Sequence, residues 1–292
     1  MKERLKKAAS VAGLIALFFV LLALFVYYRY PWNNLKLRII DDVSAHSPFV
    51  LKIGKLSPSV PVSVKVTDIR LISKQPPKVT ITVDELVARP SVWSLMFGRL
   101  KLKLNARAYD GTLLVVVKDT GDGRFDLQVS ADGLSLDKFS WPIRLGEQTS
   151  IRLGGTLGFS GSGIADPKMK QQNISGELRL NQLALLSSTI YGVDVPDTRF
   201  SPFTLKFEIK NTQLTIKPTS VSGDKLDARL QGTVNLNQRS LDRSFCNITL
   251  RVKFKGEWGD SLDSLLSWVK AKDSEGFYKI SISGPLNNLK VK

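Results

Sequence analysis

Alternation between apolar and polar residues is the feature that most constrains the fold of this chain. It recurs in runs of strand length, such as VSVKVTDIRLIS (62–73), RLKLKLNARAY (99–109) and CNITLRVKFKG (246–256), separated by short stretches rich in Gly, Pro, Asp and Asn. A period of two places successive side chains on opposite faces of a β-strand. Short connections join antiparallel neighbours, whereas parallel strands need crossover helices. The sequence therefore predicts a mainly β protein built on a long, meandering antiparallel sheet.

The stretch GRLKLKLNARAYDGTLLVVVK (98–118) shows the pattern most clearly. Asp110-Gly111 lies between two alternating runs and is a strong signal for a two-residue hairpin loop, because both loop residues need positive φ. With these two residues as the loop, Ala106 is expected to pair with Val115. One face of the hairpin is then wholly apolar and the other is mixed and basic. The apolar face is the candidate groove surface, formed by Leu102, Leu104, Ala106, Leu113, Val115 and Val117.

Four glycines stand just before alternating runs along the chain. They are Gly111, Gly155, Gly176 and Gly232, and their spacing is too irregular for a strict repeat. Positive φ costs glycine little, so these positions are predicted to lie at hairpin turns.

The apolar face allows two architectures. It could form a core against a second layer, as in a sandwich or closed barrel. It could also stay on the inner side of a long, curved sheet that does not close, leaving an apolar groove or half-barrel of the kind that marks a binding surface. The chain offers few helices to cover such a sheet, which favours the open form. Helices are expected at 33–47, 91–99 and 259–273, the last with leucines at helical spacing.

The N-terminus predicts a membrane anchor. The nineteen residues from Ala8 to Val26 carry no charge and would span roughly 28 Å as a helix, close to the thickness of a bilayer core. Basic residues precede this run, which indicates a cytoplasmic N-terminus. A cleaved signal peptide is the alternative, but the run ends in bulky residues without a small-residue cleavage site. The aromatic residues that follow suit the far membrane interface; they are Tyr27, Tyr28, Tyr30 and Trp32.

The predicted organisation places most of the chain outside the cytoplasm. Residues 1–7 form a cytoplasmic tail, 8–28 the transmembrane anchor, 29–48 a juxtamembrane helix and 49–292 a β-rich domain. The simplest location is the bacterial inner membrane, single-pass, with the β-rich domain in the periplasm.

The net charge of +16, from 42 basic and 26 acidic residues, predicts anionic partners. The exported part keeps most of this charge, and its compartment argues against nucleic acid. Anionic membrane surface and phospholipid head groups remain as partners, beside the alternative of a merely soluble basic surface.

No catalytic constellation is visible in the sequence. His46 is the only histidine, and Cys246, the only cysteine, is expected to be buried in a strand. Asp119, Asp122 and Asp126 do not meet the pattern of a calcium loop and fit a hairpin turn instead. We therefore expect a protein that is not an enzyme, with no cofactor and no metal.

Several segments resemble a known family. They are RYPW (29–32), FVLKIGKLSPSVPVSVKVTDIRL (49–71) and ARPSVWSLMFGRLKLKLNARAYDGTL (88–113), which resemble the type II secretion system protein N family. The later GDKLDARLQGTVNLNQRSLDRSFCNITLRVKF (223–254) and YKISISGPLNNLKV (278–291) are similar to the C-terminal halves of AsmA-like proteins.

The resemblance implies a non-catalytic component of the type II protein secretion system, with other secretion subunits as partners. The AsmA-like relatives imply an alternative, namely a β-groove that binds or transfers lipid between the inner and outer membranes. A structural domain with a closed core and no ligand is a third reading.

Overall fold

In the computed structural model of the protein, the described residues are 27–47, 49–60, 62–74, 80–139, 150–167, 171–190, 193–195, 197–237, 243–256, 272–286 and 288–291, with single positions between 14 and 25. Within these ranges, no helix is both long and apolar enough to cross a membrane. Most of the anchor predicted over 8–28, and nearly all of the helix predicted over 259–273, lie outside the described residues.

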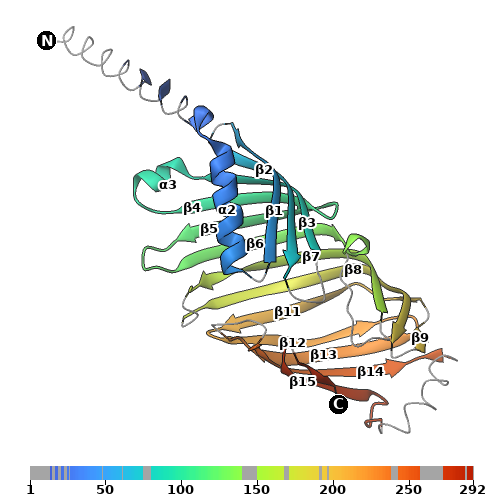
Figure 1. Cartoon of the computed structure of the whole chain (residues 1–292). Coiled ribbons are helices and arrows are strands. Elements are labelled where there is room, and N and C mark those ends of the chain that lie inside the picture. The colour runs from blue at the N-terminus through green and yellow to red at the C-terminus, as the bar shows by residue number, and fades with distance from the viewer. Residues whose placement is uncertain are drawn as a thin grey trace, which may run out of the picture.

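The protein is mainly β, and its strands form one antiparallel meander (Figure 1). The strands are β1 (Phe49–Ser59), β2 (Ser63–Ser73), β3 (Thr80–Pro90), β4 (Lys101–Ala108), β5 (Gly111–Asp119), β6 (Phe125–Ser135), β7 (Ser150–Ala165), β8 (Asn173–Ile190), β9 (Val193–Val195), β10 (Thr198–Arg199), β11 (Phe203–Lys210), β12 (Gln213–Ser222), β13 (Leu226–Asn235), β14 (Phe245–Phe254), β15 (Tyr278–Pro285) and β16 (Lys290–Val291).

Each strand pairs with its neighbours in the chain, except that β9 and β10 pair with the end of β8 beside the main path. Among the described strands, β1 at one end does not pair with β16 at the other. The sheet is therefore open, and the prediction of a long antiparallel sheet that does not close is confirmed.

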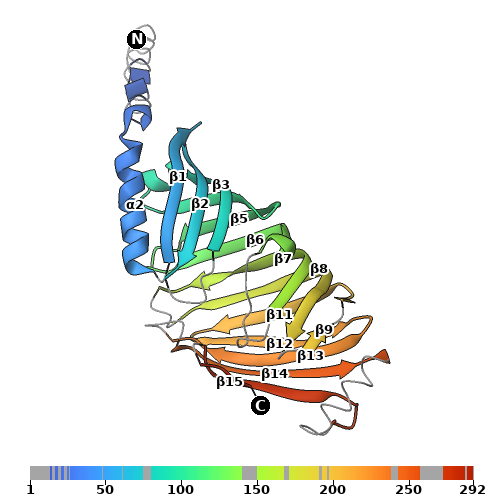
Figure 2. The same ribbon diagram turned by 45° about the vertical axis from the view of Figure 1, so that its right-hand side comes forward.

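Helix α2 (Trp32–His46) packs on the first strands, inside the range 29–48 predicted for a helix (Figure 2). Beneath it lies a buried apolar cluster formed by Leu51, Leu56, Val66 and Ile69. Polar contacts fix the helix to β1: Lys36 Nζ donates to the Gly54 carbonyl at 2.6 Å, and Leu51 N donates to Ser44 Oγ at 3.1 Å. At this end, one face of the sheet is thus covered by a helix.

An irregularity in β1 and β2 adapts the sheet to α2. Asp68 has φ of 53°, and the paired residues pass from Ile69 to Thr67 without it. A Cβ on Gly54 opposite would lie 2.7 Å from Cβ of Asp68, so only glycine fits there. Gly54 and Asp68 both leave the ladder while the register on either side of them stays the same, and Val66 and Ile69 both lie under α2 although they are three positions apart.

The short helix α3 (Val92–Met96) connects β3 to β4, and a 3-10 turn, η1 (Leu136–Lys138), follows β6. The helix predicted over 91–99 is therefore present but covers little more than one turn. Gly98, with φ of 67°, ends the segment.

The hairpin loop lies one residue earlier than predicted. Tyr109 and Asp110 have the positive φ values, 51° and 64°, and Ala108 pairs with Gly111. Gly111 is the first residue of β5, where a Cβ would come within 2.5 Å of the Asp132 carbonyl oxygen on β6. Gly111 is therefore needed for close approach of the neighbouring strand and not for the turn.

The prediction that four glycines lie at turns was wrong. Gly155, Gly176 and Gly232 lie inside β7, β8 and β13, and only Gly111 is next to a turn. A Cβ on Gly155 would lie 2.5 Å from the Gln182 carbonyl oxygen, and one on Gly232 would lie 2.6 Å from that of Asn247. These glycines therefore allow the backbone of the neighbouring strand to approach closely.

Candidate functional site

The structure brings the six residues of the predicted apolar face together. Leu102 pairs with Val117, Leu104 with Val115 and Ala106 with Leu113. The predicted register was offset by two, because the loop was placed one residue too late. An offset of two keeps every side chain on its face, so the apolar face itself is as predicted.

This face continues across the whole sheet as a row of directly paired positions. Starting on β1, the row is Pro58, Val64, Ala88, Leu104, Val115, Val129, Gly161, Gly176, Phe207, Ile216, Gly232, Ile248, Ile282 and Val291. Every member is apolar or glycine. The path crosses fourteen strands, and at about 4.8 Å between neighbours the row is roughly 60 Å long. We call this row the apolar track.

Two aromatic rings lie on the middle of the apolar track. Phe159 and Phe207 are stacked with centroids 5.8 Å apart and an interplanar angle of 19°. The glycines make room for them: a Cβ on Gly161 would lie 3.3 Å from the Phe159 ring, and one on Gly176 would lie 2.6 Å from the Phe207 ring. The rings therefore lie close to the strand backbone at these glycines. The sequence analysis missed this pair, for which strand pairing was needed.

Beyond the region under α2, several large residues of the apolar face are only half-buried, although smaller ones such as Ala106 and Cys246 are buried. Leu104, Leu113 and Val115 all keep intermediate exposure, whereas Leu56 and Val66 under the helix are buried. The same face thus serves as core at one end and as accessible apolar surface farther along the sheet.

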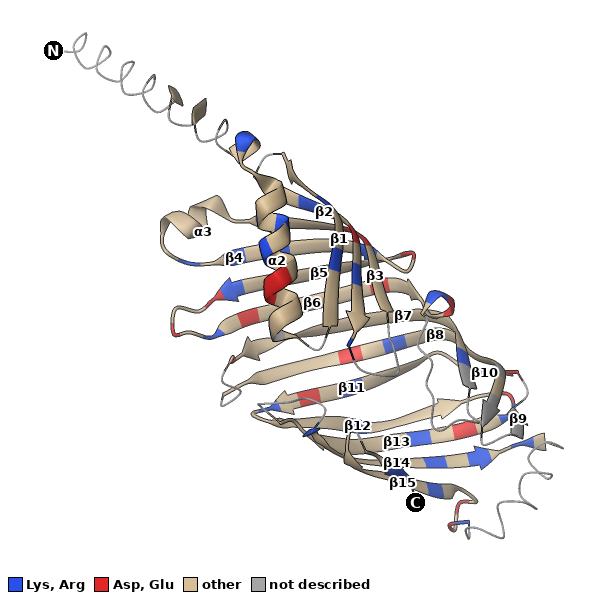
Figure 3. Cartoon of the chain, viewed as in Figure 1, with Lys and Arg blue, Asp and Glu red and all other residues tan. Residues whose placement is uncertain are grey.

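The opposite face of the sheet is mixed, with Leu114 and Val116 among polar residues. On it lies a cleft of about 720 Å³, lined by the small residues Ser160, Ser162 and Ser175 and by longer side chains such as Gln128 and Glu208. Its two carboxylates are paired: Glu208 contacts Lys217 at 2.7 Å and Lys210 at 3.3 Å, and Glu177 contacts Arg179. Hydrogen bonds from these lysines, Lys217 first, lower the pKa of Glu208. Basic residues are spread along the sheet (Figure 3).

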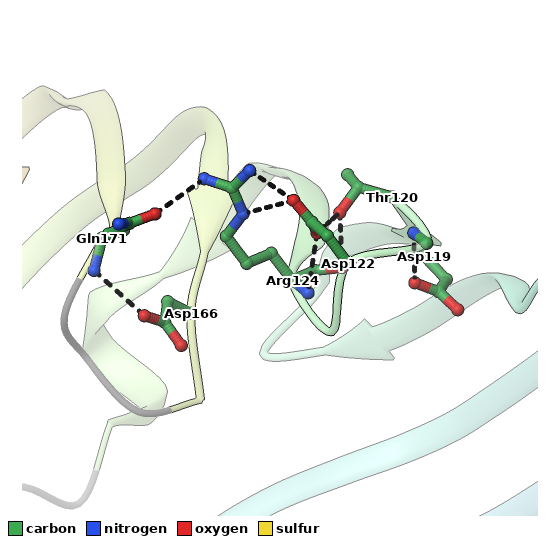
Figure 4. A network of polar contacts seen from close by, with 7 residues as sticks. Asp119, Thr120, Asp122, Arg124, Asp166 and Gln171 are labelled. Atoms are coloured by element: carbon green, nitrogen blue, oxygen red, sulfur yellow. Dashed lines mark hydrogen bonds and ion pairs between the residues drawn. The ribbon is translucent and has the colours of Figure 1, made fainter.

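The acidic loop between β5 and β6 is a network of internal hydrogen bonds (Figure 4). Asp122 accepts from Thr120 Oγ1 at 2.5 Å and from Arg124 Nε at 2.8 Å, and the Arg124 guanidinium holds the pKa of Asp122 well below its usual range. Arg124 also donates to Gln171 Oε1 at 3.3 Å, which links this loop to the one between β7 and β8. The carboxylate of Asp122 is thus engaged by protein donors.

The four predicted interface aromatic residues form one cluster with two roles. Tyr27 and Trp32 pack edge to face with centroids 5.2 Å apart, and Tyr27 Oη donates a hydrogen bond to the Ser63 carbonyl. Tyr28 and Tyr30 are exposed. The first two residues therefore fix the chain to β2, while the other two face solvent. In the described part, the buried Trp32 Nε1 has no hydrogen-bond partner.

The described residues contain no group of three or more His, Cys, Asp and Glu side chains able to hold a metal ion. His46 is the last residue of α2. Cys246, on β14, is 2% exposed, and burial raises the pKa of its thiol, so it is part of the packed sheet as predicted. Comparison with known proteins finds no matching family model, no similar curated protein and no similar solved structure.

Proposed function

We propose that the protein is a non-catalytic component of the bacterial cell envelope that is anchored in the inner membrane and holds lipid acyl chains on its apolar track. The observation that carries this proposal is the unbroken row of apolar residues and glycines across the open sheet. A surface of this length on a monomer is far larger than the isolated apolar residues that every protein exposes.

The physical chemistry of the face suits an acyl chain. Branched and aromatic side chains offer dispersion contacts without hydrogen-bond donors or acceptors, which is what a hydrocarbon chain needs. The stacked Phe159 and Phe207 provide an aromatic site in the middle, where methylene groups can lie against the rings. A row of roughly 60 Å is long enough for more than one lipid.

A photo-crosslinking experiment in cells tests this function. A photoreactive amino acid at Val115 should capture phospholipid, because Val115 is on the apolar track. The matched control is Val116, an equally apolar neighbour whose side chain lies on the opposite face and lines the polar cleft. Lipid capture at 115 and little at 116 is the expected result. Equal capture at both positions, or capture of protein alone at 115, would contradict the proposal.

The second candidate is a role in type II secretion, as the sequence resemblance implies. It is favoured by the open end of the sheet: β16 pairs with β15 only at Ile282 and Ser283. Of the described strands, none pairs with Ile280 and Ser281 on that side, and such an edge can accept a strand from another protein. In this function, deletion of the gene should trap exported enzymes in the periplasm. Normal secretion by the deletion strain would rule it out.

A further inference from the structure

Helix α3 and the residue after it form an apolar protrusion between β3 and β4. Trp93, Met96 and Phe97 keep 73%, 71% and 78% of their surface exposed. The protrusion is nevertheless well held, because Ser91 N donates to the Lys101 carbonyl at 2.8 Å and Ser91 Oγ accepts from Ser94 N at 3.4 Å. Large apolar side chains exposed on an ordered turn indicate a contact surface.

Basic side chains lie beside this protrusion. Arg99, Lys101 and Lys118 line a cleft of about 580 Å³ together with Trp93 and Phe97. Lys101 and Lys118 are directly opposite each other in the β4–β5 pair, an arrangement in which like charges destabilise a sheet.

The cleft keeps an excess of positive charge. In the described part of the chain, none of its three cations forms an ion pair. Its one carboxylate, Asp119, accepts a hydrogen bond from Gly121 N at 2.8 Å. The cleft therefore favours an anion.

The protrusion lies at the same strand ends of the sheet as the aromatic N-terminal residues. In an antiparallel sheet, the end of β1, the start of β2 and the end of β3 lie together at the same end of the strands. Tyr27 is bonded there to Ser63, the first residue of β2, and Val60, in the adjoining turn, is 73% exposed. Figures 1 and 2 show α3 near the N-terminal half of α2. Apolar and basic groups thus gather where the chain leaves the predicted anchor.

We propose that the α3 protrusion and the neighbouring strand ends form a second membrane contact, in which Trp93, Met96 and Phe97 enter the interface of an anionic bilayer. Arg99, Lys101 and Lys118 then bind the phosphate groups of its lipids. Aromatic residues favour the interface, and basic residues are attracted to the anionic surface. The paired lysines favour a bilayer over a protein partner, because a lipid surface presents many phosphates at once. This inference rests on the membrane association in the proposed function, but not on lipid occupying the apolar track.

A single fluorescent label tests the contact. Cys246 is buried, so an engineered cysteine is the accessible thiol of the described part of the chain. The full chain with Phe97→Cys carries an environment-sensitive fluorophore and is reconstituted into vesicles of phosphatidylcholine and phosphatidylglycerol in equal parts. The control label is at Phe245→Cys, an exposed aromatic position on β14. We expect the label at 97 to shift to the blue and to be quenched by spin-labelled lipid, and the label at 245 to do neither.

Charge variants separate the basic cleft from the apolar protrusion. With the label at position 97, Lys101→Gln together with Lys118→Gln should lower the ratio of membrane-inserted to water-exposed label about fivefold per lysine. The reason is that a basic residue near an anionic surface contributes about 1 kcal/mol. Lys206→Gln with Lys290→Gln removes the same charge elsewhere and should leave the ratio unchanged.

Three outcomes would overturn the inference. If the label at 97 stays in water while the protein is bound to vesicles, this inference is contradicted and the proposed function is not affected. A blue shift without quenching by lipid would mean that the protrusion contacts a protein, such as a second copy of the chain, and not the bilayer. Failure of the full chain to associate with vesicles would overturn this inference together with the membrane association of the proposed function.

Discussion

The ring of Phe207 lies against Gly176 on the neighbouring strand, so closely that a Cβ at that glycine would be 2.6 Å from Cζ of the ring and 2.7 Å from the Ser160 carbonyl oxygen. Backbone cannot move aside as a flexible side chain can. This contact holds the Phe207 ring close to the backbone at the centre of the apolar track.

Gly176→Ala should therefore destabilise the protein. We expect a loss of about 1 to 3 kcal/mol, the usual cost of forcing an extra methyl into a packed site. Gly158→Ala is the matched control on β7, because its Cβ would meet nothing closer than 3.6 Å. Urea unfolding midpoints, measured in mild detergent, report both. An equal effect of the two substitutions would contradict the close contact.

Tyr109 continues the pairing of β3 after β4 has ended. Its hydroxyl accepts a hydrogen bond from Thr82 N at 3.0 Å, and its ring stacks on Phe139 with centroids 4.2 Å apart. Tyr109→Phe keeps the stacking but leaves the Thr82 N–H without its acceptor, which should cost about 1 kcal/mol. Tyr28→Phe, at an exposed tyrosine, should have no effect on the unfolding midpoint.

The two ends of the apolar face should respond differently to the loss of methyl groups. Leu56 is buried under α2, so Leu56→Ala should cost about 2 to 4 kcal/mol. Val115 is only half-buried, and Val115→Ala should cost less than about 1.5 kcal/mol. The test is denaturant unfolding without added lipid. A loss at Val115 as large as that at Leu56 would mean that the track is closed core.

The pH dependence of stability should include a contribution from Asp273. Phe277 N donates to its carboxylate at 3.0 Å and Arg251 Nε at 2.9 Å, and these contacts lower its pKa. A carboxyl whose folded pKa is below its unfolded value stabilises the protein above the unfolded pKa, about 3.9. That stability is lost as the pH falls through the folded pKa.

Asp273→Asn should therefore be less stable than the wild type at neutral pH, and the difference should shrink as the pH falls below about 4. Asp41→Asn removes a charge from an exposed position on α2 and serves as the control. Unfolding curves between neutral and acidic pH measure the difference. A constant gap at every pH would show that the Asp273 carboxylate has no such role.

The sequence predicted the two faces of the sheet because side-chain direction depends on a period of two and survives an error in the turn. Leu104 and Val115 therefore lie on the predicted face, although Val115 pairs with Leu104 and not with Ala106 as predicted. The roles of Gly111 and Gly176 could not be predicted, since they depend on which strand lies alongside. The exposure of Trp93 and Phe97 was also missed: an apolar helical segment reads equally well as core, and only the folded chain shows that the protrusion points outward.

The meander has a consequence for how such a protein can change in size. Substantial contacts between strands join immediate neighbours in the sheet, and α2 contacts β1. Each strand therefore depends on the two beside it, as the units of a repeat protein do. An added hairpin toward the C-terminal end would lengthen the track by about 10 Å and leave the helix-covered end untouched. The length of the apolar track is thus set by the number of hairpins that follow the first few strands, and it can change without altering the part covered by α2.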